Sequence, residues 1–360
     1  MQTYLQKFND NETFDLSKQK IDAFHIGYLK EFFLTNKLKT FKLKDLILSN
    51  NNLGPSAIRI LSECAFPNQL RILNLEFNVI GAEGIKYLSF CKFLNKLELL
   101  ELYSNNIGPE GIKNLSKCTF LGELSTLGLG SNHIGLEGIK ILSECYFLKK
   151  IITLGLSLNN IGSEGIKHLS NCKFLEKIRE LWLNNNNIGD MGICYLSKFN
   201  NLKELRSLEL SDNNIGPDGI NFFSNCTFIK ELTSLWLSNN NIEDKGLKFL
   251  VSAAFLNTLE VLKLNNNNIR NDGIKSLFEC KYLSKLITLE LNYNNIDKDG
   301  INDLKSLKNT LLTSLKTISL KCNNIIGKLA NKQKLFEFLK SILPKIRKTE
   351  GYFNLNELGI

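Results

Sequence analysis

Residues 181–193 read LWLNNNNIGDMGI, a tryptophan between two leucines followed by four consecutive asparagines. Leu181 and Leu183 alternate with Trp182 as in a short strand with one buried face, so the tryptophan is expected to face solvent. Asparagine is a poor former of helix interiors and of strands. The run of asparagines therefore has to be explained by comparison with similar stretches elsewhere in the chain.

A similar stretch recurs through most of the sequence, with the pattern L-x-x-L-x-L-x-x-N-x-[IL], where x is any residue. Its asparagines recur at one constant spacing, at Asn51, Asn78, Asn105, Asn132, Asn159, Asn186, Asn213, Asn240, Asn267 and Asn294. An eleventh copy, with Asn323, follows after a slightly longer interval. The stretch FDLSKQKI fits as a degenerate N-terminal cap, with Phe14 and Leu16 at apolar positions and Gln19 in place of asparagine. A fixed period of this length indicates a repeat architecture.

Each copy predicts a strand, a turn and a helix. In NIGPEGIKNLSKC (106–118), Ile112, Leu115 and Cys118 lay an apolar stripe along a helix that Pro109 and Glu110 suit at its first turn. Neighbouring strands lie about 4.8 Å apart, whereas packed helices need about 8 to 10 Å. Stacked copies must therefore bend into an α/β solenoid, a horseshoe with a concave parallel β-sheet and convex outer helices.

This pattern resembles a leucine-rich repeat protein over roughly residues 14–327. The helical half of each copy is similar to the ribonuclease-inhibitor-like class, and similar repeats occur in NOD-like receptors and Ran GTPase-activating proteins. The chain then divides into an N-terminal arm (1–13), a capping repeat (14–42), eleven repeats of about 27 residues (43–327) and a C-terminal capping helix and tail (328–360). The capping helix is expected near 329–343, before Pro344, with an apolar face formed by Leu335, Phe338, Leu339 and Ile342.

Composition agrees with a folded protein built as one continuous architecture. Hydrophobic residues make up 43% and charged residues 22% of the 360 residues, enough for a sizeable core. The sequence has no apolar run of about 18 residues and no N-terminal order typical of a signal peptide, so we expect a soluble, cytoplasmic protein without a membrane span. The net charge of +9 comes from lysines spread along the chain and from a basic C-terminal end. A solvated lysine-rich surface explains that charge better than specific nucleic-acid binding does.

Asparagine and cysteine both have structural interpretations in the repeat. Asn186 is expected to turn inward and bind backbone groups at the corner after the strand, whereas its neighbours Asn184, Asn185 and Asn187 are attributed to compositional bias. One cysteine per repeat occupies the same helical position, where Phe199 and Ala253 also occur: Cys64, Cys91, Cys118, Cys145, Cys172, Cys226 and Cys280. Because apolar residues replace cysteine at this position in two repeats, this column of equivalent positions is expected to be buried. The pattern therefore predicts buried, reduced thiols rather than a metal site or disulfides. Cys194 and Cys322 stand outside that column and are expected to be partly exposed.

Catalytic chemistry finds little support. The three histidines, His25, His133 and His168, fall at different repeat positions, and no phosphate-binding loop or zinc-protease motif is present. The stretch GLGSNH (128–133) lacks the third glycine of a dinucleotide loop. We therefore expect no enzymatic activity, no cofactor and no metal, in a monomer whose function is binding.

Binding is expected on the solvent-facing strand positions, which vary while the leucines do not. The candidate partner-binding residues are Trp182, Trp236, Glu209, Asp212, Lys263, Tyr103, Glu101, Tyr293 and Phe77. Trp182 and Trp236 lie two repeats apart in one column, which predicts backbones about 9.6 Å apart and a shared site for a protein or peptide.

Two alternatives remain. GTPase activation of the Ran GTPase-activating type is one, although this C-terminal end is basic where that family has a long acidic tail. A recognition subunit of a ligase adaptor or effector is the other, although the short arm before the cap leaves no room for an F-box.

Overall fold

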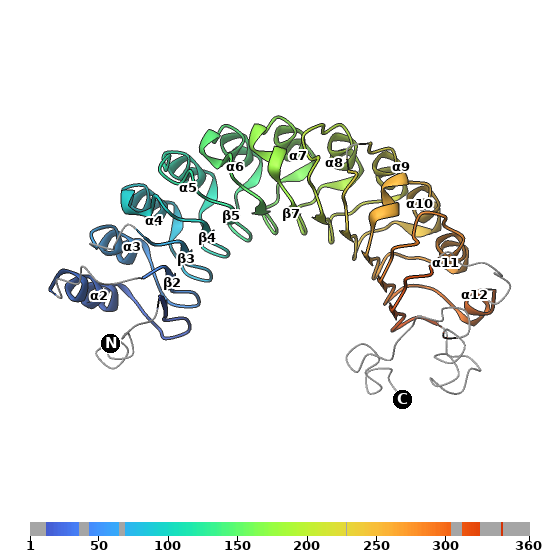
Figure 1. The fold of residues 1–360 in the computed structure, drawn as a ribbon, viewed down its shortest axis with the longest axis horizontal. Helices are drawn as coiled ribbons and strands as arrows, with labels where there is room; N and C mark the ends of the chain where they lie inside the picture. The colour runs from blue at the N-terminus through green and yellow to red at the C-terminus, as the bar shows by residue number, and fades with distance from the viewer. Residues whose placement is uncertain are drawn as a thin grey trace. The chain divides into compact units, whose positions relative to one another are not determined.

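The computed structural model describes residues 12–35, 43–64, 69–227, 229–303, 312–324 and 340. The chain forms two compact units, Met1–Trp182 and Leu183–Ile360, and both are built from the same repeat of one strand and one helix. Within each unit, Figure 1 shows the strands on the inner side of the array and the helices on its outer side. The predicted fold class, an α/β repeat solenoid with a parallel sheet, is confirmed.

Three-residue strands form a parallel sheet in each unit and follow one another in chain order. The first unit contains β1 (Thr13–Asp15), β2 (Asp45–Ile47), β3 (Ile72–Asn74), β4 (Leu99–Glu101), β5 (Thr126–Gly128), β6 (Thr153–Gly155) and β7 (Glu180–Trp182). The second contains β8 (Ser207–Glu209), β9 (Ser234–Trp236), β10 (Val261–Lys263), β11 (Thr288–Glu290) and β12 (Thr317–Ser319). The register pairs Leu100 with Leu127 and Leu127 with Leu154. Equivalent positions of successive repeats therefore form straight rows across each sheet.

In the sequence, one α-helix follows each of the strands β1 to β11. The first unit contains α2 (Ala23–Thr35), α3 (Pro55–Ser62), α4 (Gly81–Leu88), α5 (Gly108–Leu115), α6 (Gly135–Leu142) and α7 (Gly162–Leu169), with the 3-10 helices η1 (Lys92–Leu94), η2 (Tyr146–Leu148) and η3 (Lys173–Lys177). The second contains α8 (Gly189–Leu196), α9 (Pro217–Ser224), α10 (Glu243–Leu250), α11 (Asn271–Phe278), α12 (Lys298–Asp303) and the 3-10 helix η4 (Ala254–Thr258).

The apolar positions of the repeat form the core. In the repeat of β5 and α6, Leu127, Leu129, Ile139 and Leu142 are all fully buried, and Cys145 is nearly so. Burying one such aliphatic side chain contributes about 1.5 to 3 kcal/mol relative to leaving it in water. Because every repeat supplies the same set, the core is continuous along each unit and its stability is shared between neighbours.

The repeat-defining asparagines join neighbouring repeats, as predicted. Asn132 is fully buried, and its Nδ2 donates to the carbonyl oxygens of Leu102, Leu129 and Gly130 at 2.8, 3.1 and 3.0 Å. Its Oδ1 accepts from the backbone N–H groups of Asn105 and Ile107 at 2.9 and 3.3 Å. One amide thus satisfies backbone groups of two repeats at the corner where each strand ends.

The structure gives the asparagines beside this position a conformational reason, which corrects the interpretation as compositional bias. Asn185 and Asn187 have φ angles of 57° and 56°, in the left-handed region. Asparagine tolerates that region better than other residues with a side chain, because its short amide binds the local backbone. Of the four consecutive asparagines, Asn186 is thus the buried, repeat-defining residue, and it lies between two turn residues with left-handed φ angles.

Leu158 occupies the same left-handed position one repeat before Asn185, with φ 58° and 42% of its surface exposed. We expect Leu158→Asn to raise the free energy of unfolding by about 1 kcal/mol, because a branched aliphatic side chain is strained there. Leu158→Ala is the matched control, since it removes the same apolar surface but keeps a Cβ at positive φ. Urea unfolding of the three proteins measures the difference. Equal stability of the Asn and Ala variants would contradict the conformational explanation.

The N-terminal end of the first unit behaves as a repeat. Strand β1 pairs in parallel with β2, and Phe14 and Leu16 are buried. The Oδ1 of Asn51 accepts from the backbone N–H groups of Gln19 and Ile21 at 3.0 and 2.9 Å. The hydrogen bonds of the repeat-defining asparagines, which we call the asparagine ladder, therefore extend to the segment after the first strand. The boundaries proposed for the arm, cap, repeats and tail stay predictions.

The predicted C-terminal capping helix cannot be compared in the same way. Its face residues Leu335, Phe338, Leu339 and Ile342, and Pro344 after it, lie outside the described residues. Within the described part of the chain, no helix combines the length and the apolar character needed to cross a bilayer.

Candidate functional site

The predicted binding row is formed by the last residue of each strand. Trp182, at the end of β7, is 42% exposed, as strand alternation predicts. Trp182 belongs to the first unit and Trp236 to the second, so the predicted spacing of the two tryptophans stays a prediction. The strand faces of the two units differ in how far their polar groups are already paired.

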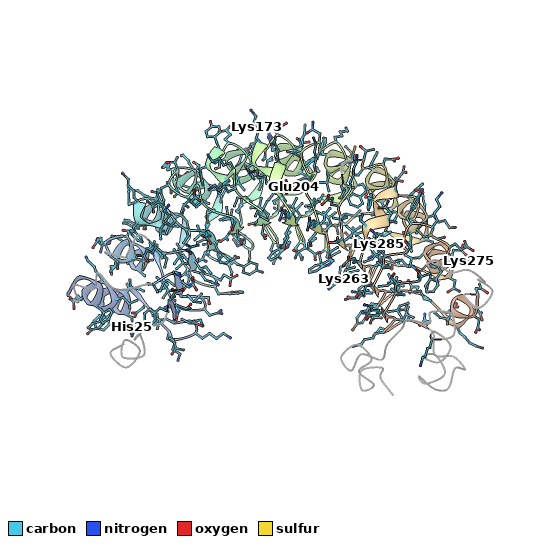
Figure 2. The ribbon with its side chains drawn as sticks, in the orientation of Figure 1. His25, Lys173, Glu204, Lys263, Lys275 and Lys285 are labelled. Atoms are coloured by element: carbon cyan, nitrogen blue, oxygen red, sulfur yellow. The ribbon has the colours of Figure 1, made fainter. Side chains whose placement is uncertain are left out.

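In the second unit, the side chains of the strand face pair with one another. The Nζ of Lys263 lies 4.3 Å from the ring centroid of Trp236 and 3.5 Å from Oε1 of Glu290. The Nδ2 of Asn265 donates to the other carboxylate oxygen of Glu290 at 2.8 Å. Figure 2 shows Lys263 on the strand side of this unit and Lys275 on its helix side. Trp236 is therefore half-buried beneath a cation of its own chain, not an open aromatic surface.

Glu209 departs from the sequence expectation. It was predicted to face solvent beside the tryptophans, but it is only 7% exposed. Its Oε1 accepts from the backbone N–H of Ser211 at 2.8 Å. Burial raises the pKa of Glu209 above its usual range, against the opposing influence of Ser211 and Lys263. Strand alternation cannot show that the glutamate lies down on the sheet in this way.

Two other predicted residues share a turn conformation rather than the strand face. Asp212 and Tyr293 have φ angles of 56° and 55°, at the same repeat position as Asn185. The Nδ2 of Asn239 donates to Oδ2 of Asp212 at 3.2 Å. Tyr293 is well exposed. Both residues therefore lie at the corner after the strand, beside the candidate row.

The first unit gathers aromatic side chains at its strand face and at the turn beside it, where Phe77 has the same repeat position as Asp212 and Tyr293. The ring centroids of Phe77 and Tyr103 lie 5.1 Å apart, and Phe77 is 47% exposed. Phe77 also has a φ angle of 52°. A bulky exposed residue in the left-handed region carries a conformational cost without a compensating burial. Phe77, Tyr103 and Trp182 thus form the aromatic group at this face, in which Phe77 and Trp182 are exposed and Tyr103 is half-buried.

Glycines let neighbouring side chains lie flat across the strands of this face. A Cβ atom on Gly128 would stand on the carboxylate of Glu101, and one on Gly130 would lie 2.6 Å from the ring of Tyr103. A Cβ on Gly155 would lie 3.5 Å from Cε3 of Trp182. We call Gly128, Gly130 and Gly155 the glycine floor. In the sequence, Gly128 and Gly130 stand out only as part of an incomplete dinucleotide-binding motif, and no sequence pattern indicates this role.

The register places the glycine floor between an acidic and an aromatic side chain. Glu101, Gly128, Gly155 and Trp182 are paired in that order across β4, β5, β6 and β7. Glu101 leans over β5, and Trp182 leans back over β6. Because paired strands lie about 4.8 Å apart, the carboxylate and the indole approach each other above two strands that carry no side chain in this row.

Glu101 has an unusual electrostatic environment. Burial raises the pKa of Glu101 to about 7, and the negative charge of Glu76 raises it in the same direction. Among the residues that the structure describes, the side chain of Glu101 has no hydrogen-bond or ion-pair partner. Its carboxylate is therefore half-buried without compensation, unlike the carboxylate of Glu290.

This environment predicts a pH-dependent stability. The folded protein retains a proton on Glu101 that the unfolded chain loses above the ordinary pKa of 4.5, so stability falls as pH rises from about 4.5 to about 7. We expect Glu101→Gln to be more stable than the wild type above pH 7 by about 1 kcal/mol, allowing for solvent around the side chain, and equally stable near pH 4. Urea unfolding across this range measures both. Glu110→Gln on α5 should show no such difference, and a constant offset at all pH values would contradict the assignment.

Comparisons with known proteins show what the repeats and the fold are similar to. Six segments match the family described as Leucine Rich repeat, at residues 68–89, 93–116, 148–170, 202–224, 231–251 and 255–278. The chain contains leucine-rich repeats. No curated protein matches it. Among solved structures, an internalin (inlF) from Listeria monocytogenes matches with a TM-score of 0.57 and 20% identity, over 95% of this chain and 87% of that chain.

A second structural neighbour is an octameric complex of latrophilin 3, Unc5D and the leucine-rich repeats of FLRT2. It matches with a TM-score of 0.50 and 18% identity, over 89% of each chain. At these identities the likeness concerns the fold alone. It confirms a leucine-rich repeat solenoid and leaves the site to be argued from the residues of this chain.

Another hollow lies on the helical side of the leucine-rich repeats. Its volume is about 630 Å³, and it lies beside η2 and η3 with Lys149, Lys173 and Lys177 among its lining residues. Glu144 and Glu176 also line it. Its charges are therefore mixed, whereas the strand residues of the first unit include carboxylates and no lysine or arginine. The hollow is the weaker candidate.

The titratable residues considered for catalysis are dispersed. His25 pairs with Asp22 at 2.5 Å, and His133 has a φ angle of 55° at an exposed turn. All seven cysteines of the repeat column are buried, as predicted, while Cys194 is half-buried and Cys322 exposed. Among the described residues, no three or more His, Cys, Asp or Glu side chains form a group that could hold a metal ion.

Proposed function

We propose that this chain is a non-catalytic protein-interaction scaffold that binds a partner protein or peptide on its concave strand face. The observation that carries the proposal is the aromatic group of the first unit, in which Phe77 and Trp182 are exposed and Tyr103 is half-buried. None of these side chains is needed to fill the core, which the repeated leucines and isoleucines already fill. Large aromatic side chains in such positions commonly dominate the energetics of an interface.

The fold supports this use. A solenoid fixes its buried positions by stacking and leaves a broad face whose residues differ from repeat to repeat. The octameric complex named for one structural neighbour is a precedent for leucine-rich repeats in a protein assembly. GTPase activation and recognition for a ligase adaptor or effector would each also begin with a bound protein.

Three further properties belong to the same proposal. The repeats are assigned to the ribonuclease-inhibitor-like class, because a short α-helix closes most described repeats. A reducing, cytoplasmic setting suits nine free thiols. The protein is proposed to act as a monomer and without nucleic acid, because its strand face carries carboxylates and aromatic rings rather than a basic surface.

Affinity capture followed by mass spectrometry tests the proposal. Partners captured by the wild-type chain should be lost with Trp182→Ala, which we expect to weaken binding by about 2 kcal/mol or more while leaving the unfolding midpoint unchanged. Tyr146→Ala is the matched control, because Tyr146 is an aromatic residue exposed on η2, away from the strand face. If both variants retain the partners equally, the concave face is not the binding surface.

A further inference from the structure

The strands of the first unit carry only acidic charges, and the basic residues Lys44, Arg71 and Arg179 directly precede β2, β3 and β7. Asp15, Asp45, Glu101 and Glu180 are strand residues, and Glu76 lies two residues after the end of β3. No lysine or arginine stands at a strand position of β1 to β7. The whole chain has a net charge of +9, so an acidic strand face is contrary to its average. Such a face attracts a basic partner and repels an acidic one.

Within this acidic face, no described residue pairs with the side chain of Glu101 or of Glu180, and Glu101 is the one whose carboxylate lies over Gly128. Asp45 accepts from the hydroxyl of Thr13 at 2.8 Å, and Asp15 accepts from the backbone N–H of Ser17 at 2.8 Å. The Nδ2 of Asn74 donates to Glu76 at 3.2 Å. Glu101 has neither a donor nor a cation among the described residues. A half-buried carboxylate with no compensation is best satisfied by a charge supplied from outside.

The surroundings of Glu101 fit a cationic group. Its carboxylate and the indole of Trp182 lean toward each other above Gly128 and Gly155, where no side chain of the row intervenes. A carboxylate on one side and an aromatic face on the other form the environment that an ammonium or guanidinium group prefers. The second unit shows the same combination in its own chain, with Lys263 between Trp236 and Glu290.

We propose that the strand face of the first unit binds a basic segment of the partner, one of whose arginine or lysine side chains lies between Glu101 and Trp182 above the glycine floor. This inference rests on the proposed concave-face binding and names the chemistry of the partner. Lys263 occupies the equivalent place in the second unit, whereas in the first unit the cation comes from the partner. The ionised form of Glu101 is the binding form, so affinity rises as pH increases through about 7.

Selection of phage-displayed random linear peptides on the full chain provides the probe. The enriched peptides are synthesised, and their binding is measured by fluorescence anisotropy with arginine present and with citrulline in its place. We expect an arginine or lysine common to the enriched peptides. Citrulline should weaken binding roughly tenfold or more, because the neutral side chain cannot pair with the carboxylate.

Two variants test the position of the cation. Glu101→Gln should weaken the same peptides roughly tenfold or more and remove the rise in affinity with pH, whereas Glu110→Gln on α5 should change neither. Gly155→Val should also weaken binding, because it fills the glycine floor. We expect the variant to keep its fold, because a Cβ at Gly155 meets its neighbours only at ordinary contact distances of 3.5 Å or more. Its unfolding midpoint checks that.

The outcomes separate this inference from the proposed function. Peptides that lose binding to Trp182→Ala but share no basic residue, or bind Glu101→Gln normally, overturn the cation site and leave concave-face binding standing. Peptides that bind every strand-face variant normally overturn both. A selection that enriches no peptide also counts against both.

Discussion

Replacing Asn132 by alanine is expected to lower the free energy of unfolding by about 3 kcal/mol or more. The fully buried amide makes three donor contacts and two acceptor contacts with backbone groups of two repeats. Alanine removes all of them and leaves the N–H groups of Asn105 and Ile107 buried without this acceptor. Each unsatisfied buried group costs about 1 to 3 kcal/mol.

Urea unfolding measures the loss, and hydrogen exchange at the amides of Asn105 and Ile107 shows where it occurs. Because repeats are stabilised by their neighbours, exchange should increase most in the two repeats that Asn132 joins. Asn171→Ala, an exposed asparagine after α7, should change stability by less than about 0.5 kcal/mol. A loss below about 1 kcal/mol for Asn132→Ala would show that the ladder does not hold the repeats together.

The buried cysteine column is expected to resist alkylation in the native protein. Burial raises the pKa of the Cys118 thiol to about 12, and the same holds for Cys91 and Cys172. At pH 8 a thiol of that pKa is ionised on the order of a thousandfold less than an ordinary cysteine, and only the thiolate reacts. Cys322 is exposed and should react first.

Iodoacetamide labelling followed by peptide mass spectrometry distinguishes these thiols. Cys322→Ser should remove the fast reaction, and urea should make the column cysteines reactive together as the repeats unfold. Labelling of Cys118 as fast as Cys322 in the native protein would show that the column is accessible, and would also weaken the case for a purely structural role.

The repeat could be predicted from sequence because its buried positions obey simple periodicities. Leu127 and Leu129 alternate as a strand requires, and Ile139 and Leu142 keep helical spacing. The inward position of the ladder asparagines also followed, since a polar residue that recurs once per repeat within an apolar frame must satisfy backbone groups. These inferences depend only on local geometry repeated along the chain.

The strand face was less predictable. Alternation correctly placed Trp182 in solvent but also placed Glu209 there, and Glu209 is buried. Composition alone did not explain Asn185 and Asn187, whose left-handed φ angles became visible only in the folded turn. The sequence distinguished neither the self-paired Lys263 from an available cation nor the unpaired Glu101 from other glutamates.

The sequence by itself determined the repeat length, the α/β solenoid, the buried leucines and cysteines, and which residues end each strand. Only the tertiary structure decided which of those strand-end residues lie open and which pair with their neighbours. The physical reason is that the direction in which a surface side chain leans depends on what the adjacent repeat presents. Glu101 and Trp182 lean over strands whose equivalent residues are glycine, and those glycines are a whole repeat away in sequence but one strand spacing, about 4.8 Å, away in space.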